Sequence, residues 1–514
     1  MKSAFLDLAF GIILLIQGAV AQPAPKSPVP PDSEIRKILV DPIDRDKQSV
    51  GIVVGLIEST GRRIIAYGSW AKDDKRPLNG DTIFEIGSVT KVFTSLLLAD
   101  MVQRGEVALT DPVAKYLPPT VKMPERGRHS IALVDLSTHT SGLPRLPGNI
   151  SMKDPANPYA DYSVEQLYQF LSSYSLPRDP GEKFEYSNLG GGLLGHVLAR
   201  RAGVDYEALI QSRIAGPLGM RSTRIALPPS LKERLAVGHD ATLKAVPNWN
   251  LSTLAGAGAL RSTANDMLNF LAANLGYMES PLAGAMASMT RTRRPMGTPG
   301  MEIGLGWLAR TRDGNEIVWH SGGTGGFRSY VGYDPKRRVG VVVLSNAETP
   351  TGVDDIGMHL LDGQTPLMKA PSEHKEISLD PKLFDGYVGR YELAPSFIIT
   401  VTREGNQLFL QATGQPRAEI FPESERDYFL KVVDAQITFE VDAQGKTTGL
   451  VLHQGGMNQP AKRIEGEASP VKEHKQVAVD PKLFDGYVGR YELVPSFVIT
   501  VTRAGNQLFV QATG

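Results

Sequence analysis

The spacing of apolar residues changes along the chain and predicts which segments are strands and which are helices. Residues 50–58 and 63–67 are dense in β-branched residues and are separated by a turn at Ser59-Thr-Gly61, which predicts a β-hairpin. Apolar side chains then recur at helical spacing over residues 89–104, and Gly105 is a suitable helix stop. This part of the chain is therefore expected to pass from paired strands into one long apolar helix.

A mostly helical and loop-rich stretch follows to about residue 295. Strand patterns then return in four segments, at residues 303–309, 317–320, 328–333 and 339–345. Strands at both ends with helices between them predict an α+β fold, in which one antiparallel sheet is covered by helices and joined to a mainly helical region. We assign this fold to residues 34–365.

The last third of the chain contains a repeat. Residues 380–414 recur as residues 480–514, and 31 of these 35 positions are identical. Both copies lead into alternating strand patterns, so we expect a small all-β accessory domain at 366–466 and a partial second copy at 467–514. The second copy stops about halfway. Strand addition to another module, fraying, and a truncated or misassembled sequence are the three explanations, and the near-identity of the copies favours the last.

Composition narrows the class of protein. Fifty-five basic and 55 acidic residues cancel, so no strongly basic face for nucleic acid is expected. The chain has no cysteine, which excludes disulfides, thiolate metal sites and a cysteine nucleophile. It also has no His-Glu-x-x-His motif, and we expect neither a metal nor a cofactor.

The N-terminus has the pattern of a secretory signal over residues 1–21. Lys2 supplies a positive charge, residues 9–16 are apolar, and Ala19-Val-Ala21 is a small-residue cleavage pattern before a Pro-rich leader at 22–33. The apolar run is short for a membrane-spanning helix. We therefore expect a periplasmic or secreted bacterial protein with no transmembrane anchor after cleavage.

Ser88-Val-Thr-Lys91 is the first motif that carries chemistry. Ser-x-x-Lys recurs elsewhere in the chain, but only this copy both follows a strand-like segment and opens a long apolar helix. A serine there lies beside free backbone N–H groups and the positive end of the helix dipole. Lys91 lies one turn further on the same face and can approach the Ser88 oxygen. From this motif alone, an N-cap serine with a solvated lysine is equally acceptable.

Tyr186-Ser-Asn188 supplies further groups. A serine hydroxyl needs a base, and Tyr186 qualifies if nearby cations such as Lys91 favour its anion. Asn188 offers an amide that can donate to a substrate carbonyl and also fix the lysine. Standing alone, the motif would be better explained by a tyrosine packed in a loop.

His320-Ser-Gly322 ends a strand-like segment and is followed by Gly323. Because Gly322 and Gly323 lack β-carbons, a substrate acyl group could lie against the strand edge. The N–H groups of Gly323 and Ser88 are expected to form an oxyanion hole. The Ser321 hydroxyl and the His320 imidazole are expected to hold a substrate carboxylate. The alternative is a glycine-rich turn with a structural histidine.

Together with His139-Thr-Ser-Gly-Leu-Pro144 and Ala257-Gly-Ala-Leu-Arg-Ser-Thr263, these motifs resemble the class C β-lactamase family and its relatives. Those relatives include serine DD-peptidases, D-amino-acid peptidases and carboxylesterases. The resemblance covers roughly residues 35–360 and implies a β-lactamase/transpeptidase-like fold. The C-terminal part is similar to the small β-barrel-like domain often appended to such hydrolases.

The resemblance implies a role for each motif residue. Ser88 would be the nucleophile, Lys91 and Tyr186 the general acid/base pair, and Asn188 a substrate-positioning amide. The His320-Ser-Gly322 motif stands where class C enzymes usually carry Lys-Thr-Gly, and it is similar to the His-Thr-Gly of some DD-peptidases. His139 is interpreted as a structural loop residue.

The leading expectation is a serine hydrolase that forms an acyl-enzyme at Ser88 with β-lactams or D-alanyl peptides, of the β-lactamase or D-Ala-D-Ala carboxypeptidase type. A carboxylesterase of the same family is one alternative, and it would need no carboxylate clamp. A non-catalytic penicillin-binding or sensor protein is another, and the intact Ser88, Lys91, Tyr186 and Asn188 argue against it.

Overall fold

The computed structural model describes residues 29–466, apart from 152–153, 350–351, 369–373, 395–396, 414, 416, 432, 434 and 455–456. Of the remaining chain it describes Phe484 and the strands at 489–494, 497–504 and 507–512. The expected signal segment at 1–21 and the leader as far as residue 28 lie outside these residues. The chain forms two compact units, Met1–Ala370 and Pro371–Gly514.

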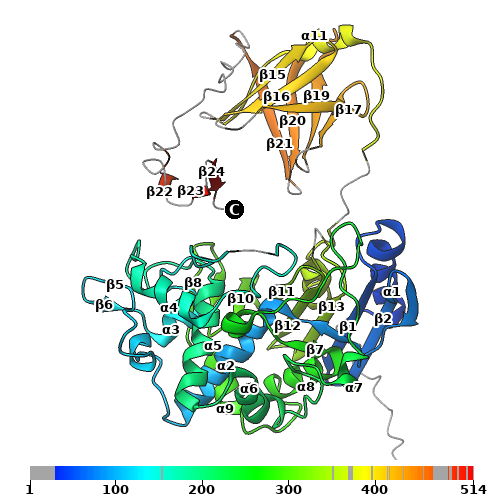
Figure 1. Ribbon diagram of the computed structural model, residues 1–514. Helices are drawn as coiled ribbons and strands as arrows, with labels where there is room; N and C mark the ends of the chain where they lie inside the picture. The colour runs from blue at the N-terminus through cyan, green and yellow to red at the C-terminus, as the bar shows by residue number, and fades with distance from the viewer. Residues whose placement is uncertain are drawn as a thin grey trace, which may run out of the picture. The chain divides into compact units, whose positions relative to one another are not determined.

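The first unit is built on a nine-stranded antiparallel sheet in the order β3-β2-β1-β13-β12-β11-β10-β9-β8 (Figure 1). The early hairpin pairs with the late strands through β1 and β13, where Val54 lies opposite Val343. The predicted sheet, closed by both ends of its domain, is confirmed. Its strands are β1 (Gly51–Glu58), β2 (Gly61–Ala71), β3 (Asp74–Pro77), β8 (Arg294–Pro295), β9 (Met301–Ile303), β10 (Leu308–Arg312), β11 (Asn315–Gly323), β12 (Arg328–Asp334) and β13 (Val339–Ser345).

The expected strand at 303–309 is divided in the structure. β9 ends at Ile303 and β10 begins only at Leu308. Gly304 and Gly306 lie between them, and Gly306 has a φ of +70°, which a strand does not accept. The dense apolar character of the segment concealed this break.

Helices cover both faces of the sheet. On one face, α1 (Asp32–Val40) packs on β2, and α10 (Asp354–Leu361) packs on β12 and β13. On the other face, α8 (Ala264–Asn274) packs on β1 and β13. Two separate apolar cores result, one on each side of the sheet.

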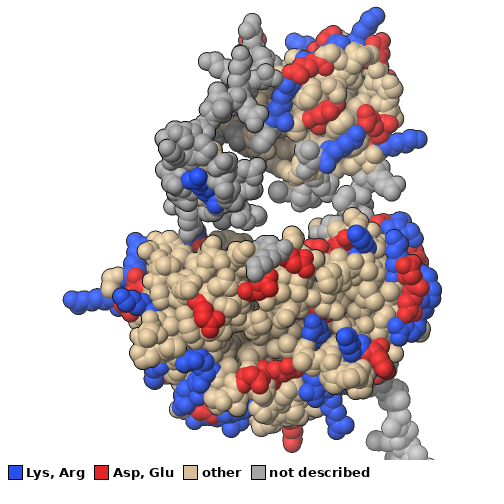
Figure 2. Space-filling view, viewed as in Figure 1, with Lys and Arg blue, Asp and Glu red and all other residues tan. Residues whose placement is uncertain are grey.

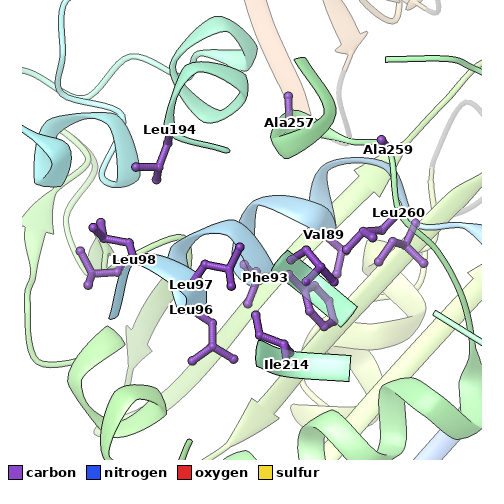
Figure 3. Close-up of a cluster of buried hydrophobic side chains, with 14 of the residues drawn as sticks. Val89, Phe93, Leu96, Leu97, Leu98, Leu194, Ile214, Ala257, Ala259 and Leu260 are labelled. Carbon is purple, nitrogen blue, oxygen red and sulfur yellow. The ribbon is translucent and has the colours of Figure 1, made fainter. Parts of the chain in front are cut away.

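The predicted long helix is α2 (Thr90–Gln103), which lies in the interior of the first unit. A short 3₁₀ turn, η2 (Gly87–Val89), leads into it. All but its last two residues are buried, because other helices and the sheet surround it. Figure 3 shows its side chains against those of neighbouring segments: Val89, Phe93, Leu96, Leu97, Leu98, Leu194, Ile214 and Leu260.

The rest of the first unit is mainly helical, as expected. Its remaining α-helices are α3 (Leu133–Ser137), α4 (Val164–Ser173), α5 (Asn188–Ala202), α6 (Tyr206–Ile210), α7 (Pro229–Lys232) and α9 (Ala283–Met289). A 3₁₀ segment, η5 (Ser252–Ala257), packs along α5. Two small strand pairs join β4 (Ile83–Glu85) to β7 (Arg261–Thr263) and β5 (Glu125–Arg126) to β6 (His129–Ser130).

The second unit contains a closed all-β barrel, which confirms the expected C-terminal β fold. Stacked and edge-on aromatic rings fill its core, with Tyr387, Tyr428 and Phe439 in mutual contact. The short helix α11 (Phe384–Tyr387) precedes the barrel. Its strands are β14 (Gly389–Ala394), β15 (Phe397–Glu404), β16 (Gln407–Ala412), β17 (Ala418–Pro422), β18 (Asp427–Leu430), β19 (Ala435–Val441), β20 (Thr447–Gln454) and β21 (Met457–Ile464).

The second copy of the repeat forms a three-stranded sheet of its own, β22 (Gly489–Val494), β23 (Phe497–Ala504) and β24 (Gln507–Ala512). Its register repeats that of β14–β16, since Gly389 pairs with Val401 and Gly489 pairs with Val501. The barrel closes through β14 and β21. The second copy therefore supplies none of the barrel's strands.

Basic and acidic residues are interspersed on the face of the molecule seen in Figure 2. Among the described residues, no helix is long and apolar enough to cross a membrane.

Candidate active site

The turn that carries Ser88 packs closely against strand β11. Gly87, Gly322 and Gly323 lie at this contact, and their lack of a side chain makes it possible. Gly87 has a φ of +47°, and a β-carbon there would lie 2.7 Å from both the nitrogen and the oxygen of Gly323. A β-carbon on Gly322 would lie 2.1 Å from the Ile86 oxygen and 2.8 Å from the Ser88 nitrogen. Such contacts are far too short for any side chain. Ser88 thus sits at the junction of η2 and β11, at the start of α2.

β11 extends further than the sequence pattern indicated. The expected strand ended at His320, whereas β11 continues through Gly323, where Gly322 pairs with Ser329 and Gly323 with Arg328. The His320-Ser-Gly322 motif therefore lies inside a paired strand. Its glycines carry no apolar signal, which is why the strand seemed to stop early.

Lys91 is the centre of the site. Its Nζ lies 3.0 Å from Ser88 Oγ, 2.8 Å from Asn188 Oδ1 and 2.7 Å from the backbone oxygen of Ala257. The residue is only 2% exposed. Burial holds the pKa of Lys91 well below its usual value, and the positive charge of Arg145 lowers it further.

The three contacts of Lys91 fix where the hydrogens and the lone pair of a neutral amine would point. Asn188 Oδ1 and the Ala257 oxygen are acceptors, so each takes one N–H hydrogen. The remaining lone pair then faces Ser88 Oγ and can accept its hydroxyl proton. A lysine with a lowered pKa in this position has the geometry of a general base.

Tyr186 lies beside Ser88 and Lys91. It hydrogen-bonds to Ser88, and Lys91 Nζ lies 4.8 Å from the centre of its ring. Burial raises the pKa of Tyr186 to about 12, although the hydrogen bond to Ser88 and the charge of Arg145 act in the opposite direction. The condition under which Tyr186 would be a base, stabilisation of its anion by nearby cations, is therefore not met in the resting site. Burial outweighs them, and Tyr186 holds its proton.

Asn188 is fixed on both sides of its amide. Oδ1 accepts from Lys91, and Nδ2 donates to the Tyr159 hydroxyl at 3.0 Å. The residue begins helix α5, which Ser187 caps by accepting a hydrogen bond from the Gly190 N–H at 2.8 Å. The capped helix start sets the position of the amide.

His139 has the structural place that was expected for it. Its Nδ1 accepts from the Ser187 N–H at 3.1 Å, and its carbonyl accepts from the Glu185 N–H at 2.7 Å. Its ring centre lies 4.5 Å from that of Tyr186. Burial holds the pKa of His139 well below its ordinary value, so the ring is neutral. The His139 ring therefore packs against the Tyr186 ring and helps to fix its position.

His320 faces the site but cannot supply a charge there. Burial lowers the pKa of His320 to about 3, and its Nδ1 lies 2.6 Å from the Ser321 oxygen. Its ring centre is 6.4 Å from that of Tyr186. The buried Nε2 has no hydrogen-bond partner among the described residues. The expected contact between His320 and a substrate carboxylate would therefore not be an ion pair at neutral pH.

Ser321 points to the other side of the sheet. Along β11, Ile317 and Trp319 belong to the core shared with α10, and Ser321 continues this alternation. Burial raises the pKa of Asp354, the first residue of α10, and a side-chain hydrogen bond with Ser321 acts in the opposite direction. Ser321, Gly322 and Gly323 are each partly exposed.

The structure adds three residues that the motifs did not reveal. Arg145 is exposed, with its guanidinium carbon 5.4 Å from the Tyr186 ring centre, and it directly follows the His139–Pro144 motif. Tyr159 and Asp354 reach the site from a loop and a helix that carry no recognisable pattern. Of these three, only Arg145 had a signal in the sequence, through its place next to a motif.

The described residues contain no group of three or more His, Asp and Glu side chains that could hold a metal ion. The groups that converge here are a hydroxyl, an amine, a phenol and an amide. Such a set is suited to attack on an acyl carbon and to proton transfer.

Two family descriptions match the chain. The family described as Beta-lactamase matches residues 37–362, which include every site residue named above. A domain of unknown function, DUF3471, matches residues 373–467, which include the barrel.

The regions that align with curated relatives span most of each relative's length. A D-alanyl-D-alanine-carboxypeptidase/endopeptidase, AmpH, of Escherichia coli strain K12 is 30% identical over 65% of this chain and 91% of its own. Penicillin-binding protein 4* of Bacillus subtilis is 27% identical over 78% of this chain and 92% of its own. A β-lactamase of Pseudomonas fluorescens is 28% identical over 62% of this chain and 95% of its own.

Solved structures that superpose on this chain have the β-lactamase fold. A class C β-lactamase from Rhodobacter sphaeroides superposes with a TM-score of 0.56 at 27% identity, over 64% of this chain and 98% of its own. A β-lactamase/D-alanine carboxypeptidase from Yersinia pestis, solved with citrate, superposes with a TM-score of 0.56 at 26% identity, over 65% of this chain and 97% of its own.

Proposed function

The chain belongs to the β-lactamase family, and from this premise we propose that it is a serine hydrolase that forms an acyl-enzyme at Ser88 with D-alanyl peptides or β-lactams. One observation carries the proposal. Asn188 Oδ1 and the Ala257 carbonyl oxygen hold the Nζ of Lys91 at 3.0 Å from Ser88 Oγ. Burial lowers the pKa of Lys91. Neutral Lys91 can therefore deprotonate Ser88.

Acylation follows from this arrangement. Ser88 Oγ attacks the substrate carbonyl carbon while its proton passes to Lys91. The N–H groups of Ser88 and Gly323, brought together where η2 meets β11, stabilise the resulting oxyanion. Tyr186 gives its phenolic proton to the leaving nitrogen as the C–N bond breaks, and it receives in return the proton that Lys91 took.

Deacylation uses the same groups in reverse. A water attacks the ester carbon, gives a proton to Lys91, and adds its oxygen to the acyl group. The ester bond breaks and Ser88 recovers its proton from Tyr186, which Lys91 reprotonates. The products are a free acid and the original enzyme. Asn188, fixed by Lys91 and Tyr159, is available to position the substrate carbonyl.

The names of the relatives support both substrate classes. One is called a D-alanyl-D-alanine-carboxypeptidase/endopeptidase, and another a β-lactamase. Those names, together with the signal pattern at 1–21, also support a protein that works in the periplasm or outside the cell.

The test is covalent labelling by a fluorescent penicillin. Wild type should be labelled, and Ser88→Ala should not. Ser372→Ala is a matched control, because it removes the serine of another Ser-x-x-Lys sequence in the same chain. A wild type that takes up neither penicillin nor an acyl group from a D-Ala-D-Ala peptide would refute the proposal.

A carboxylesterase is a second candidate, and the state of the carboxylate clamp favours it. His320 is neutral, and the Ser321 hydroxyl is engaged by Asp354. An ester without a carboxylate needs neither group. Comparing kcat/KM for p-nitrophenyl butyrate and nitrocefin separates the two, since a pure esterase would cleave only the first. A sensor protein would give a stable acyl-enzyme and no turnover.

A further inference from the structure

We infer that the Arg145 guanidinium binds the carboxylate on the leaving side of the substrate, and that it thereby selects D-alanyl peptides and β-lactams over esters without a carboxylate. This inference rests on the proposed acylation of Ser88. It moves the recognition of the carboxylate from strand β11, where the sequence motif predicted it, to the loop that follows Pro144.

The substrate would bring a negative charge close to Tyr186. In a D-alanyl-D-alanine peptide and in a penicillin, the carbon atom bonded to the leaving nitrogen also bears a carboxylate. Tyr186 protonates that nitrogen in the proposed mechanism, so the phenol must come within hydrogen-bond distance of it. The carboxylate is then held beside the Tyr186 side chain, where it needs a positively charged partner.

Arg145 is a free cation at this place. Its guanidinium carbon lies 5.4 Å from the centre of the Tyr186 ring. The Arg145 side chain is exposed, and Ser88, Tyr186 and Asn188 are partly exposed, so a bound substrate can reach all four residues. The guanidinium makes no ion pair or hydrogen bond with any residue that the structure describes. Its N–H groups are therefore available to a carboxylate, which an arginine binds through two parallel hydrogen bonds.

The loop that carries Arg145 is fixed to the start of helix α5. The Arg145 carbonyl accepts hydrogen bonds from the N–H groups of Asn188 at 3.0 Å and Leu189 at 3.2 Å. The Ser187 hydroxyl donates to the Pro144 carbonyl at 2.7 Å. The backbone of Arg145 is therefore held in place next to Asn188, and only its side chain has to turn towards a substrate.

The charge of Arg145 already acts on the reacting groups. Burial lowers the pKa of Lys91, and the charge of Arg145 lowers it further. Burial raises the pKa of Tyr186 to about 12, and the charge of Arg145 acts against this shift. A cation whose field reaches both groups also attracts an anion that is bound next to them.

Strands β11 and β12, which the structure describes in full, offer no free cation on the side of the sheet that faces Tyr186. Burial lowers the pKa of His320 to about 3, so its ring is neutral. Arg328 is two positions before Tyr330 on β12 and lies with it on the α10 face. The Arg328 guanidinium is also paired with Glu348 at 3.1 Å. Arg145 is therefore better placed to bind the carboxylate than either strand residue.

The first experiment compares wild type and Arg145→Gln on two thioesters that differ in one group. N-benzoyl-D-alanyl thioglycolate has a carboxylate on its leaving group, and the matching thioglycolamide has an amide. Wild type should release thiol with a kcat/KM at least about tenfold higher for the carboxylate, and Arg145→Gln should lower this ratio by about tenfold or more. The loss should appear mainly in KM, because the ion pair is present in both the bound substrate and the transition state.

Two results would overturn the inference in this experiment. One is a wild type that does not prefer the carboxylate, and the other is the same ratio in Arg145→Gln and wild type. Arg145→Gln also changes the pKa of Lys91, but both thioesters share this effect and it cancels in the ratio.

Two further variants test whether the guanidinium itself makes the contact. Arg145→Lys keeps the charge without the paired N–H groups, so its ratio should lie between those of wild type and Arg145→Gln. Arg221→Gln removes another exposed arginine of the same unit and should keep the wild-type ratio. If Arg221→Gln lowers the ratio as much as Arg145→Gln does, net charge explains the preference and the inference fails.

A second pair of thioesters tests which side of the substrate Arg145 binds. N-succinyl-D-alanyl thioglycolamide has a carboxylate on its acyl side, and the N-succinamyl compound has an amide there. Arg145→Gln should leave the ratio of their kcat/KM values at the wild-type value. If this ratio falls and the leaving-side ratio does not, Arg145 binds an anion on the acyl side and the inference is wrong.

These outcomes separate the inference from the proposed function. If none of the thioesters acylates Ser88, the proposed function fails. If they do and Arg145→Gln leaves the leaving-side ratio unchanged, only the role of Arg145 fails. Because each ratio is measured on one preparation, partial unfolding of a variant cancels.

Discussion

At the scale of single residues, two titrating groups lie side by side with pKa values pushed in opposite directions. Burial disfavours the charged form of each, so it lowers the pKa of Lys91 and raises that of Tyr186 to about 12. The lysine is thereby prepared to accept a proton and the tyrosine to donate one. In the proposed mechanism this opposition makes Lys91 the base and Tyr186 the acid.

Arg145 tunes the base. Its positive charge lowers the pKa of Lys91, so Arg145→Gln should raise that pKa. In the proposed mechanism, activity requires neutral Lys91 and is lost as the pH falls through the pKa of Lys91. The acidic limb of the kcat/KM profile should therefore move to higher pH in the variant.

Arg221→Gln, at another exposed arginine of the same unit, is the control and should leave the limb in place. An acidic limb that stays fixed or moves to lower pH in Arg145→Gln would contradict the assignment of Lys91 as the base.

Tyr186→Phe removes the proton donor and preserves the ring between His139 and Lys91. We expect the acylation rate to fall by about 10²- to 10⁴-fold, because one acid/base group is lost. The midpoint of thermal unfolding should change little. Rapid-mixing kinetics with nitrocefin measures the rate, and acylation at the wild-type rate would mean that another group protonates the leaving nitrogen.

The motif residues could be predicted from the sequence because each motif joins its chemistry to a local structural cue. Ser88 stands at a helix start, and Lys91 is one turn away. Tyr159 and Asp354 had no such cue, since they reach the site only through tertiary packing. The protonation of Tyr186 also depends on burial, which composition does not reveal.

At the scale of elements, the site depends on how closely β11 approaches η2. The apolar pattern predicted the long helix to within one residue at each end, as residues 89–104 against Thr90–Gln103. It placed the end of β11 too early. Gly322 and Gly323 are paired strand residues without an apolar side chain, so the pattern could not register them.

Gly322→Ala tests this approach. Its β-carbon would be placed 2.1 Å from the Ile86 oxygen, so η2 must move away from β11 and carry Ser88 with it. We expect a loss of about 1–3 kcal/mol in the free energy of unfolding, together with a large fall in kcat/KM. Denaturant unfolding and nitrocefin turnover provide the two measurements.

Gly363→Ala is the comparison, because a β-carbon there meets nothing within 4 Å. It should resemble wild type in both measurements. If Gly322→Ala resembles it too, the contact between η2 and β11 does not position the nucleophile.

At the scale of the whole molecule, the candidate active site lies in the first unit, and the second unit contains the β barrel and the three-stranded sheet of the second repeat copy. The sheet closed by both ends of its domain was predictable, because strand patterns flank the helical stretch. The independent sheet formed by β22–β24 was not, although its register copies that of the barrel. The near-identical sequences give the two copies the same local strand pairing, but they do not determine which further strands pair with each copy.

The signal pattern at the N-terminus makes a prediction for the whole chain. Cleavage after Ala21 should give a protein that begins at Gln22. Expression in a bacterium with its own export machinery, followed by N-terminal sequencing of the periplasmic fraction and the medium, measures the start. An exported protein that keeps Met1 would refute the predicted cleavage.

Mass spectrometry of the protein after brief incubation with benzylpenicillin and with a D-Ala-D-Ala peptide tests the central claim most directly. The account predicts one added acyl group with at least one of the two compounds, mapped to the peptide that carries Ser88, lost with time and absent from Ser88→Ala. Turnover of substrate with no acyl group on Ser88, or with the group on another residue, would contradict it.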